Sequence, residues 1–317
     1  MMLVFKLKMV MGGEFLSFNL TMLNLWIGLC RGVRGLPRDL KELGYVDKWI
    51  ELKFANQDLE AVCPDLMVAS EEVNHALLLE FKSGANTEPD QLRRYSRVTQ
   101  NDLVVRAQIS REATHSHDVT IVGKSEHSKR LCIGISDGGY QFPLLLADED
   151  GLVLGHNQFR VRQLNSLFSL RLQIDWSRVP SMFVPIDRDS ELWEVAEVVM
   201  PKVLGYMTEL RPLARVGEIC QDICNTWGIM DEPARNELRS KVREVLRVAV
   251  RRHFKPYLRL VISRDSVEIR NNPLDLQPDK RTAAYRRLRT AQRDLIENLR
   301  TGHGANSNGQ LTLPHLE

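Results

Sequence analysis

The spacing of apolar and polar residues in the first half of the chain predicts helices followed by short strands. A largely apolar stretch from about residue 15 to 43, broken at Gly35 and Pro37, predicts helix. Three later segments mix apolar and polar positions in short runs separated by turn-forming residues, a pattern typical of strands. These predicted strands are 49–54, 59–69 and 76–82.

The chain after residue 82 predicts a second helix and more of the sheet. Thr87 is a suitable N-cap, and Pro89 fits the first turn of a helix that includes 91–98. Residues 118–123 predict another strand, and three further apolar segments are expected to extend the sheet: 131–135, 142–147 and 152–154. A helix, three strands, a helix and a strand, in this order, predict a mixed α/β domain with a central sheet.

The pattern changes near residues 180–190, where prolines and charged residues predict a linker. A helix capped by Ser190 is expected to end before Pro201. From Leu213 onward, two helices separated by a turn at Gly228 are predicted. The remaining predicted elements are a hairpin of 257–263 with 267–270, and a final helix over about 282–299.

Two helices joined by a tight turn and followed by a hairpin resemble a winged helix-turn-helix. A chain of 317 residues is about twice the usual length of one domain. The sequence therefore predicts an α/β domain over 1–180, a mainly helical nucleic-acid-binding domain over 190–300 and a flexible tail over 301–317.

Composition and charge refine this division. The 43% hydrophobic and 26% charged residues are ordinary for a globular protein and exclude a disordered or fibrous chain. The net charge of +2 hides two unequal parts, because residues 1–200 carry 22 Lys and Arg against 27 Asp and Glu, whereas residues 201–317 carry 21 against 14. Arginines outnumber lysines by 31 to 12, and the guanidinium fork suits phosphate recognition. An acidic front and an arginine-rich back favour a nucleic-acid partner.

The cysteines and the N-terminal region favour a cytoplasmic protein. Five scattered cysteines give no disulfide framework, so a reducing compartment is expected. The start of the chain contains Lys6 and Lys8 and lacks a cleavage site typical of a signal peptide. The apolar stretch that contains Asn19 and Asn24 is too short for a membrane span and predicts a buried helix. No membrane association is expected.

The residues with the clearest chemistry are Asp65, which follows Pro64, and the pair Glu80 and Lys82 on the third predicted strand. Side chains alternate along a strand, so Glu80 and Lys82 share a face with Leu78. A hairpin between neighbouring strands could place the Asp65 carboxylate beside Glu80. Two such carboxylates repel each other, and a hard cation such as Mg²⁺, or alternatively Mn²⁺, relieves that repulsion through oxygen ligands. With a nearby lysine, this set suits metal-assisted hydrolysis of a phosphodiester.

This combination resembles the PD-(D/E)xK, or restriction-endonuclease-like, nuclease superfamily, whose core has the same αβββαβ order. Gln91 and Tyr95 on the next predicted helix resemble the QxxxY element of its RecB-type branch. The resemblance covers about residues 15–125. It implies an Mg²⁺-dependent nuclease in which Asp65 and Glu80 bind the metal and Lys82 is the catalytic lysine. Gln91 and Tyr95, on one helix face, are expected to hold the substrate backbone or the lysine.

Members of this superfamily often contribute one more carboxylate from the first helix. Glu42 is the candidate for this metal ligand, and Glu14 and Glu51 rank behind it, since none of the three has a fixed spacing from the motif.

The second predicted domain carries a row of arginines on its 231–252 helix. They recur every four residues and form a slowly winding stripe, which could follow a phosphate backbone. The stripe consists of Arg235, Arg239, Arg243, Arg247 and Arg251. The alternative is a solvated face with Glu237 and Glu244 as intrahelical partners. The final helix adds further arginines and an apolar stripe, expected to dock either on its own domain or on a second subunit, which leaves a homodimer open.

These features together predict a metal-dependent deoxyribonuclease that acts in defence against foreign DNA or in the processing of mobile elements. Its expected partners are DNA and, for control of the cleavage, a regulatory protein. Two alternatives remain: a non-catalytic nucleic-acid-binding protein that keeps the nuclease fold, and a transcription regulator whose front domain senses a ligand.

Overall fold

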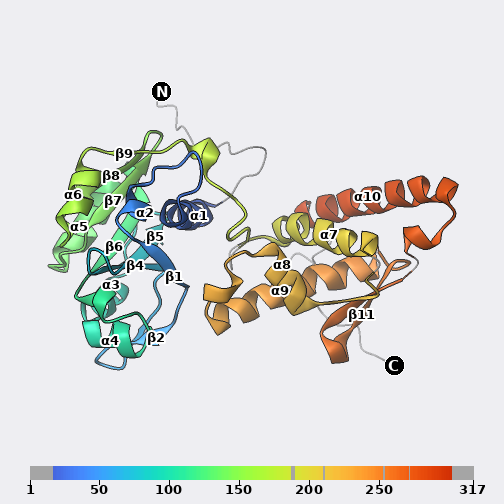
Figure 1. The fold of residues 1–317 in the computed structure, drawn as a ribbon, viewed down its shortest axis with the longest axis horizontal. Helices are drawn as coiled ribbons and strands as arrows, with labels where there is room; N and C mark the ends of the chain where they lie inside the picture. Colours follow the sequence, from blue (N-terminus) through green and yellow to red (C-terminus); the bar gives the residue numbers. More distant parts are fainter. Residues whose placement is uncertain (1–16, 187–189, 210, 253, 271, 302–317) are drawn as a thin grey trace. The chain divides into compact units, whose positions relative to one another are not determined.

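The computed structural model describes residues 17–186, 190–209, 211–252, 254–270 and 272–301 (Figure 1). The chain divides into two units. Unit 1 takes the described residues up to Val184 together with Gly228–Asp231, and unit 2 takes the rest. The predicted mixed α/β fold is confirmed, because unit 1 contains a seven-stranded mixed sheet with helices around it.

The sheet of unit 1 has the order β1-β4-β5-β6-β7-β8-β9. Its first three strands are antiparallel, β5, β6 and β7 run parallel, and the last two pairings are antiparallel again. The strands are β1 (Val46–Ile50), β4 (Leu66–Ser70), β5 (His75–Lys82), β6 (Ser116–Lys124), β7 (Leu144–Asp148), β8 (Gly151–His156) and β9 (Leu172–Gln173). A small hairpin of β2 (Phe54–Ala55) and β3 (Ala61–Val62) interrupts the chain before β4.

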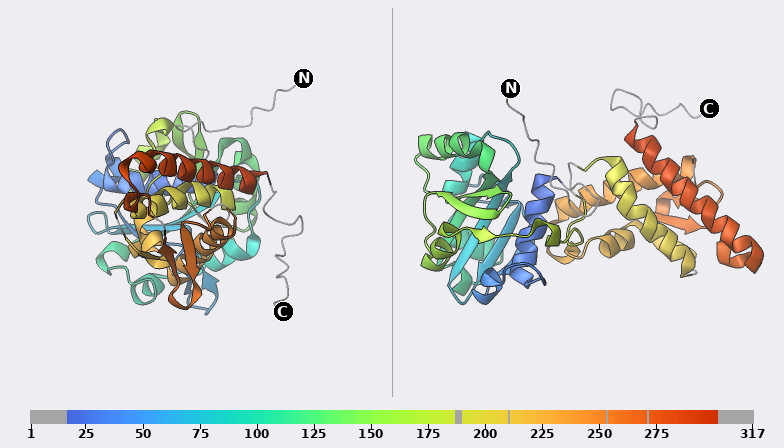
Figure 2. Two further views of the ribbon diagram at one scale, coloured as in Figure 1. Left: turned by 90° about the vertical axis from the view of Figure 1, so that its right-hand side faces the viewer. Right: turned by 90° about the horizontal axis from the view of Figure 1, so that it is seen from above.

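Helices cover both faces of this sheet (Figure 2). On one face, Leu78 of β5 lies in a hydrophobic cluster with residues of α3 (Pro89–Ser96), α4 (Gln100–Val105) and α5 (Ser128–Asp137). On the other, α1 (Phe18–Arg31) packs on β1 and β5, and its Trp26 ring contacts Phe168 of α6 (Arg162–Ser169) at 6.0 Å between centroids. A short helix, α2 (Asp39–Glu42), follows α1.

Helix α1 has local signals at both ends. The Ser17 side chain accepts a hydrogen bond from the backbone N–H of Leu20, and the helix ends at Gly32, whose φ of 66° is easily adopted by glycine. Inside the helix, Asn24 is fully buried. Its side-chain oxygen accepts from the backbone N–H groups of Phe183 and Val184, and its nitrogen donates to the Val184 carbonyl. The polar residue in this apolar stretch therefore fixes the end of unit 1 to its first helix.

Unit 2 is mainly helical. Its elements are α7 (Leu192–Thr208), β10 (Leu213–Arg215), α8 (Val216–Ile223), α9 (Glu232–Arg251), β11 (Leu258–Val261), β12 (Ser266–Ile269) and α10 (Pro278–Arg300). The three strands form an antiparallel sheet of order β10-β12-β11. Helix α7 packs against both α9 and α10.

Four sequence expectations differ from this structure. Residues 131–135 lie in α5 rather than in a strand, because the buried Leu131 and Ile135 are one helical turn apart. The N-cap of α3 is Glu88 instead of Thr87. Helix α7 has Glu191 as its N-cap and continues through Pro201, since its buried face resumes at Val203. The chain at Leu213 forms β10 before α8 begins.

The expected tail, 301–317, lies outside the described residues apart from Thr301. Within the described part of the chain, none of the helices combines the length and the apolar character needed to cross a membrane.

Replacing Asn24 tests the anchor between α1 and the end of unit 1. We expect Asn24→Ala to lower the free energy of unfolding by about 3 kcal/mol, because buried backbone groups of Phe183 and Val184 lose their partners. Denaturant titration followed by circular dichroism measures this loss. The matched control is Asn19→Ala on the same helix, whose buried side-chain oxygen has no partner in the described structure, so its removal is expected to cost little. Equal losses in both variants would contradict the assigned anchor.

Candidate active site

The register of β4 against β5 brings Asp65 next to Glu80. Leu66 is paired with Leu79 in this antiparallel ladder, so the residue before β4 lies opposite the next residue of β5. The Asp65 carboxylate accepts a hydrogen bond of 2.6 Å from the backbone N–H of Phe81. The two carboxylates of the sequence motif therefore lie side by side where β4 begins and β5 approaches its end.

The Glu80 carboxylate is the centre of the polar cluster. Its Oε1 lies 3.0 Å from Lys82 Nζ and accepts a 2.9 Å hydrogen bond from Gln91 Nε2. Its Oε2 lies 2.6 Å from the Tyr95 hydroxyl. The Lys82 ammonium in turn donates to Gln91 Oε1 at 2.7 Å. Glu80, Lys82, Gln91 and Tyr95 thus form one connected network, and Glu80 is only 6% exposed.

Helix α3 supplies Gln91 and Tyr95 to this network. The two residues are one turn apart, so both point from the same helix face toward β5. Tyr95 is 2% exposed and packs in the hydrophobic cluster below α3, while its hydroxyl reaches both Glu80 and the Cys63 carbonyl, the latter at 2.8 Å. A hydroxyl has one proton and can donate to only one of these acceptors at a time.

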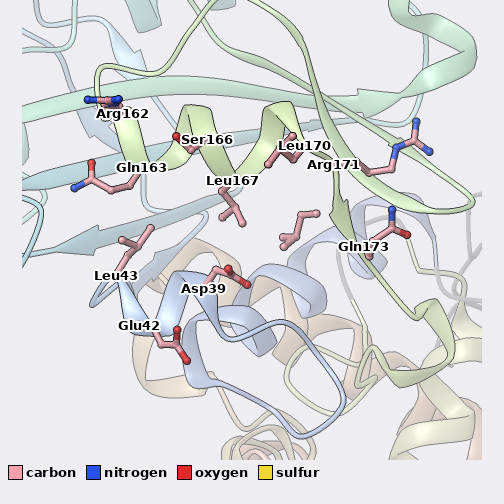
Figure 3. Close-up of a pocket in the computed structure, with 11 residues that line it drawn as sticks. Asp39, Glu42, Leu43, Arg162, Gln163, Ser166, Leu167, Leu170, Arg171 and Gln173 are labelled. Atoms are coloured by element: carbon pink, nitrogen blue, oxygen red, sulfur yellow. The ribbon is translucent and has the colours of Figure 1, made fainter.

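Glu42 does not lie in this network. It is part of α2 and lines a groove of about 970 Å³ with residues of α6 and of the following segment up to Gln173 (Figure 3). That groove contains none of the polar residues around Glu80. The expectation that Glu42 is the third metal ligand is therefore corrected: α2 places this side chain beside α6 instead of beside Asp65.

Of the two other candidates from the sequence, Glu14 lies outside the described residues, and Glu51 is brought toward Asp65. Ile50, the last residue of β1, is paired with Leu66, so Glu51 stands opposite Asp65, and its backbone N–H donates to the Asp65 carbonyl at 3.1 Å. Glu51 has a φ of 51°, which is uncommon for a residue with a side chain and marks a sharp turn after the strand. The sequence pattern predicted Glu51 to lie inside a strand over 49–54, whereas β1 ends at Ile50, and the register of β1 against β4 is what brings Glu51 opposite Asp65.

Comparison with known protein families identifies the part of the chain that holds this network. The sequence matches the MJECL32 domain over residues 19–184, which is more than half of the 317-residue chain. The chain belongs to the MJECL32 domain family. No curated protein and no solved structure was found to be significantly similar to it. The family description states no reaction, so the chemistry of the site rests on its own geometry.

Electrostatics in the MJECL32 domain follow from the closeness of its carboxylates. The pKa of Asp65 lies well above its ordinary value of 3.8, because the carboxyl group is largely removed from solvent and because the charges of Glu80 and Glu51 repel its own; the hydrogen bond from Phe81 partly opposes this. The pKa of Tyr95 is also raised, mainly by burial and by the charge of Glu80. Tyr95 therefore stays a neutral phenol that can donate its proton.

The donor set of the MJECL32 domain fits a hard cation that takes only part of its ligands from the protein. Asp65 and Glu80 offer carboxylate oxygens, and the raised pKa of Asp65 records a repulsion that a cation would remove. Mg²⁺ commonly binds through one or two carboxylates and keeps several water ligands. In the described residues, no three His, Cys, Asp or Glu side chains are arranged as a complete metal-binding group. The site therefore suits a cation that is completed by water or substrate.

The arginine stripe of unit 2 divides into two parts. Three of its residues are half-buried and make contacts within the unit. Arg235 donates to the Trp227 carbonyl at 3.0 Å, and Arg239 lies over the Trp227 ring. Arg243 binds both oxygens of Asp265, at 2.6 and 2.9 Å, and so ties α9 to the turn between β11 and β12.

The other two arginines of the stripe, Arg247 and Arg251, are exposed on the outer side of α9. Neither is within 4.0 Å of a carboxylate in the described structure. The half of the stripe that is free to meet a ligand is therefore its C-terminal half.

The pH dependence of stability tests whether folding raises the pKa of Asp65. A carboxyl group whose pKa is raised by folding stabilises the protein below its ordinary pKa of 3.8, and this contribution is lost as pH rises through the raised value. In the absence of divalent cations, we therefore expect Asp65→Asn to be more stable than the wild type at neutral pH. The advantage should shrink toward pH 4, as measured by thermal unfolding in EDTA. An advantage that does not change with pH would contradict the raised pKa.

Proposed function

We propose that this protein is a metal-dependent deoxyribonuclease that hydrolyses phosphodiester bonds of DNA. The observation that carries the proposal is the meeting of Asp65, Glu80 and Lys82 at the ends of two paired strands. Further support comes from the order α1, β1, β4, β5, α3, β6, in which three antiparallel strands are followed by a helix and a parallel strand. The PD-(D/E)xK superfamily has this order in its core.

Asp65 and Glu80 would hold Mg²⁺, or alternatively Mn²⁺, with Glu51, which lies opposite Asp65, as a further carboxylate. When bound, such a cation supplies Lewis-acid polarisation of the phosphate and a more acidic water. Its charge also offsets the repulsion that raises the pKa of Asp65.

Side chains of the protein orient the reacting groups. Lys82 is held by Glu80 and Gln91, so its ammonium has a fixed direction and can orient the attacking water or stabilise charge on the phosphate. The Gln91 side-chain oxygen accepts a hydrogen bond from Lys82, and its side-chain nitrogen donates one to Glu80. Tyr95 holds the second oxygen of Glu80 in place from the buried side.

Unit 2 supplies DNA affinity in this proposal. Its order α7, β10, α8, α9, β11, β12, with a sheet of order β10-β12-β11, resembles a winged helix-turn-helix, which supports this assignment. In such a module α9 is the recognition helix, and the exposed Arg247 and Arg251 are its phosphate contacts. The setting that fits the superfamily resemblance is defence against foreign DNA or the processing of mobile elements, in the cytoplasm.

One observation favours a non-catalytic DNA-binding protein as the second candidate. Both oxygens of Glu80 are already satisfied by Lys82, Gln91 and Tyr95. A cation that binds Glu80 must displace one of these contacts, and a domain that has lost turnover could use the network for stability alone.

A cleavage assay separates the two candidates. The wild type is incubated with supercoiled, linear and single-stranded DNA in Mg²⁺, Mn²⁺ or EDTA, and products are resolved on gels. We expect cleavage with Mg²⁺ or Mn²⁺ and none in EDTA, and we expect Asp65→Ala and Lys82→Ala each to lower the rate by about 100-fold or more.

A matched control is Asp39→Ala, which removes an exposed carboxylate of α2 in the same unit. It should cut at the wild-type rate. DNA binding without cleavage under every metal condition would support the non-catalytic candidate. Cleavage that is equal in the wild type and in Asp65→Ala would refute the assigned site.

A further inference from the structure

The outer face of α10 carries a row of arginines that the proposed function does not use. From Lys280 to Arg293 this helix contains basic residues and no acidic one. Arg286, Arg289 and Arg293 are all exposed, and Arg293 has 79% of its side chain in solvent. At 100° per residue, these three side chains lie within about 60° of one another on one face of the helix.

The opposite face of α10 is the one that packs. Ala284, Leu288 and Leu295 are buried, with at most 6% exposure, and α10 contacts α7. These residues lie about 130° or more around the helix from the middle of the arginine row. The row therefore points away from the core of unit 2.

The arginines of this row have few carboxylate partners among the described residues. Arg286 and Arg289 have no carboxylate within 4.0 Å in the described structure, and the partner of Arg293 is its sequence neighbour Asp294 at 3.7 Å. On α9, by contrast, Arg243 is held by two hydrogen bonds to Asp265. Exposed like charges on one helix face repel one another. This row is therefore a candidate binding surface for an anionic ligand.

The position of α7 separates this row from α9. Helix α7 packs against α10 on one side and against α9 on another, and Figure 1 shows it between the two. Arg247 and Arg251 lie on the side of α9 that faces away from its buried residues Leu238, Val242 and Ala249. Each basic face thus lies on the side of its helix that is turned away from its buried residues, and α7 packs against both helices.

We propose that the outer face of α10 is a second phosphate-binding surface, so that unit 2 holds two DNA segments at once, one on α9 and one on α10. The identity of the polyanion as duplex DNA rests on the proposed function. Arginines favour phosphates through paired hydrogen bonds. An anionic membrane is the poorer partner, because the described residues of α10 expose no large apolar side chain that could enter a bilayer.

The test measures DNA binding and DNA bridging in EDTA, so that cleavage plays no part. One biotinylated duplex is immobilised, and capture of a second, fluorescent duplex by the protein is recorded. The principal variant combines Arg286→Ala, Arg289→Ala and Arg293→Ala. A second variant replaces the same residues by Lys and keeps the charge. The matched control combines Thr282→Ala and Thr290→Ala, two exposed positions of the same helix.

We expect the wild type and the threonine control to capture the second duplex. The alanine triple should bind one duplex through α9 but lose capture, and the salt dependence of total binding should fall by about 2.7 in the log–log slope for three lost phosphate contacts. The lysine triple should retain most of the capture. Removal of Arg247 and Arg251 should also abolish capture, because it leaves only the α10 surface. Circular dichroism confirms that each variant is folded.

Capture and a salt slope that are unchanged in the alanine triple would overturn the proposal, as would loss of capture in the threonine control. The outcome is separable from the proposed function. A protein that bridges duplexes through α10 but never cuts DNA with Mg²⁺ or Mn²⁺ refutes the nuclease and keeps the second surface. A protein that cuts DNA but shows no effect of the alanine triple keeps the nuclease and refutes the second surface.

Discussion

The pairing of β4 with β5 is the constraint on which the candidate site depends. With Leu66 opposite Leu79, Asp65 falls beside Glu80 and can accept the backbone N–H of Phe81. A shift of the register by one residue would turn the side chains of β5 to the other face and would separate the carboxylates. Because β5 is buried on both faces up to Phe81, such a shift would move the Glu80 carboxylate to the apolar face that packs against α1, where a charge is costly to bury. The core of unit 1 therefore fixes the spacing of its polar site.

Helix α3 converts this pair of carboxylates into an organised network. Tyr95 is anchored in the hydrophobic cluster below the helix and presents its hydroxyl to Glu80, and Gln91 links Glu80 to Lys82. The negative charges remain close together, which raises the pKa of Asp65 and costs stability at neutral pH. Proteins accept such local costs most often at functional sites. A cation bound between the carboxylates would offset this loss of stability. The raised pKa of Asp65 is therefore consistent with the proposed metal-dependent chemistry.

The sequence could predict those features that depend on local periodicity. The alternation of β5 assigned Leu78, Glu80 and Lys82 to one face, and the i, i+4 spacing placed Gln91 together with Tyr95. It could not select Glu51 over Glu42, because that choice depends on the register of β1 against β4 and on the position of α2. Likewise, the repeat of arginines on α9 gave their spacing, but only the position of Asp265 at the hairpin turn shows that Arg243 is already paired. The prediction that the helix ends before Pro201 is wrong, because the tertiary packing of α7 outweighs the effect of a local helix breaker.

The central claim is that Asp65 and its neighbouring carboxylates form a divalent-cation site, and calorimetric titration with Mn²⁺ tests it most directly. We expect the wild type to bind Mn²⁺, and we expect Asp65→Asn and Glu51→Gln to weaken that binding, the former by about 10-fold or more. Glu42→Gln should bind as the wild type does, because its side chain lies in the groove beside α6. Absence of Mn²⁺ binding by the wild type, or binding that Glu42→Gln removes and Asp65→Asn leaves intact, would contradict the account.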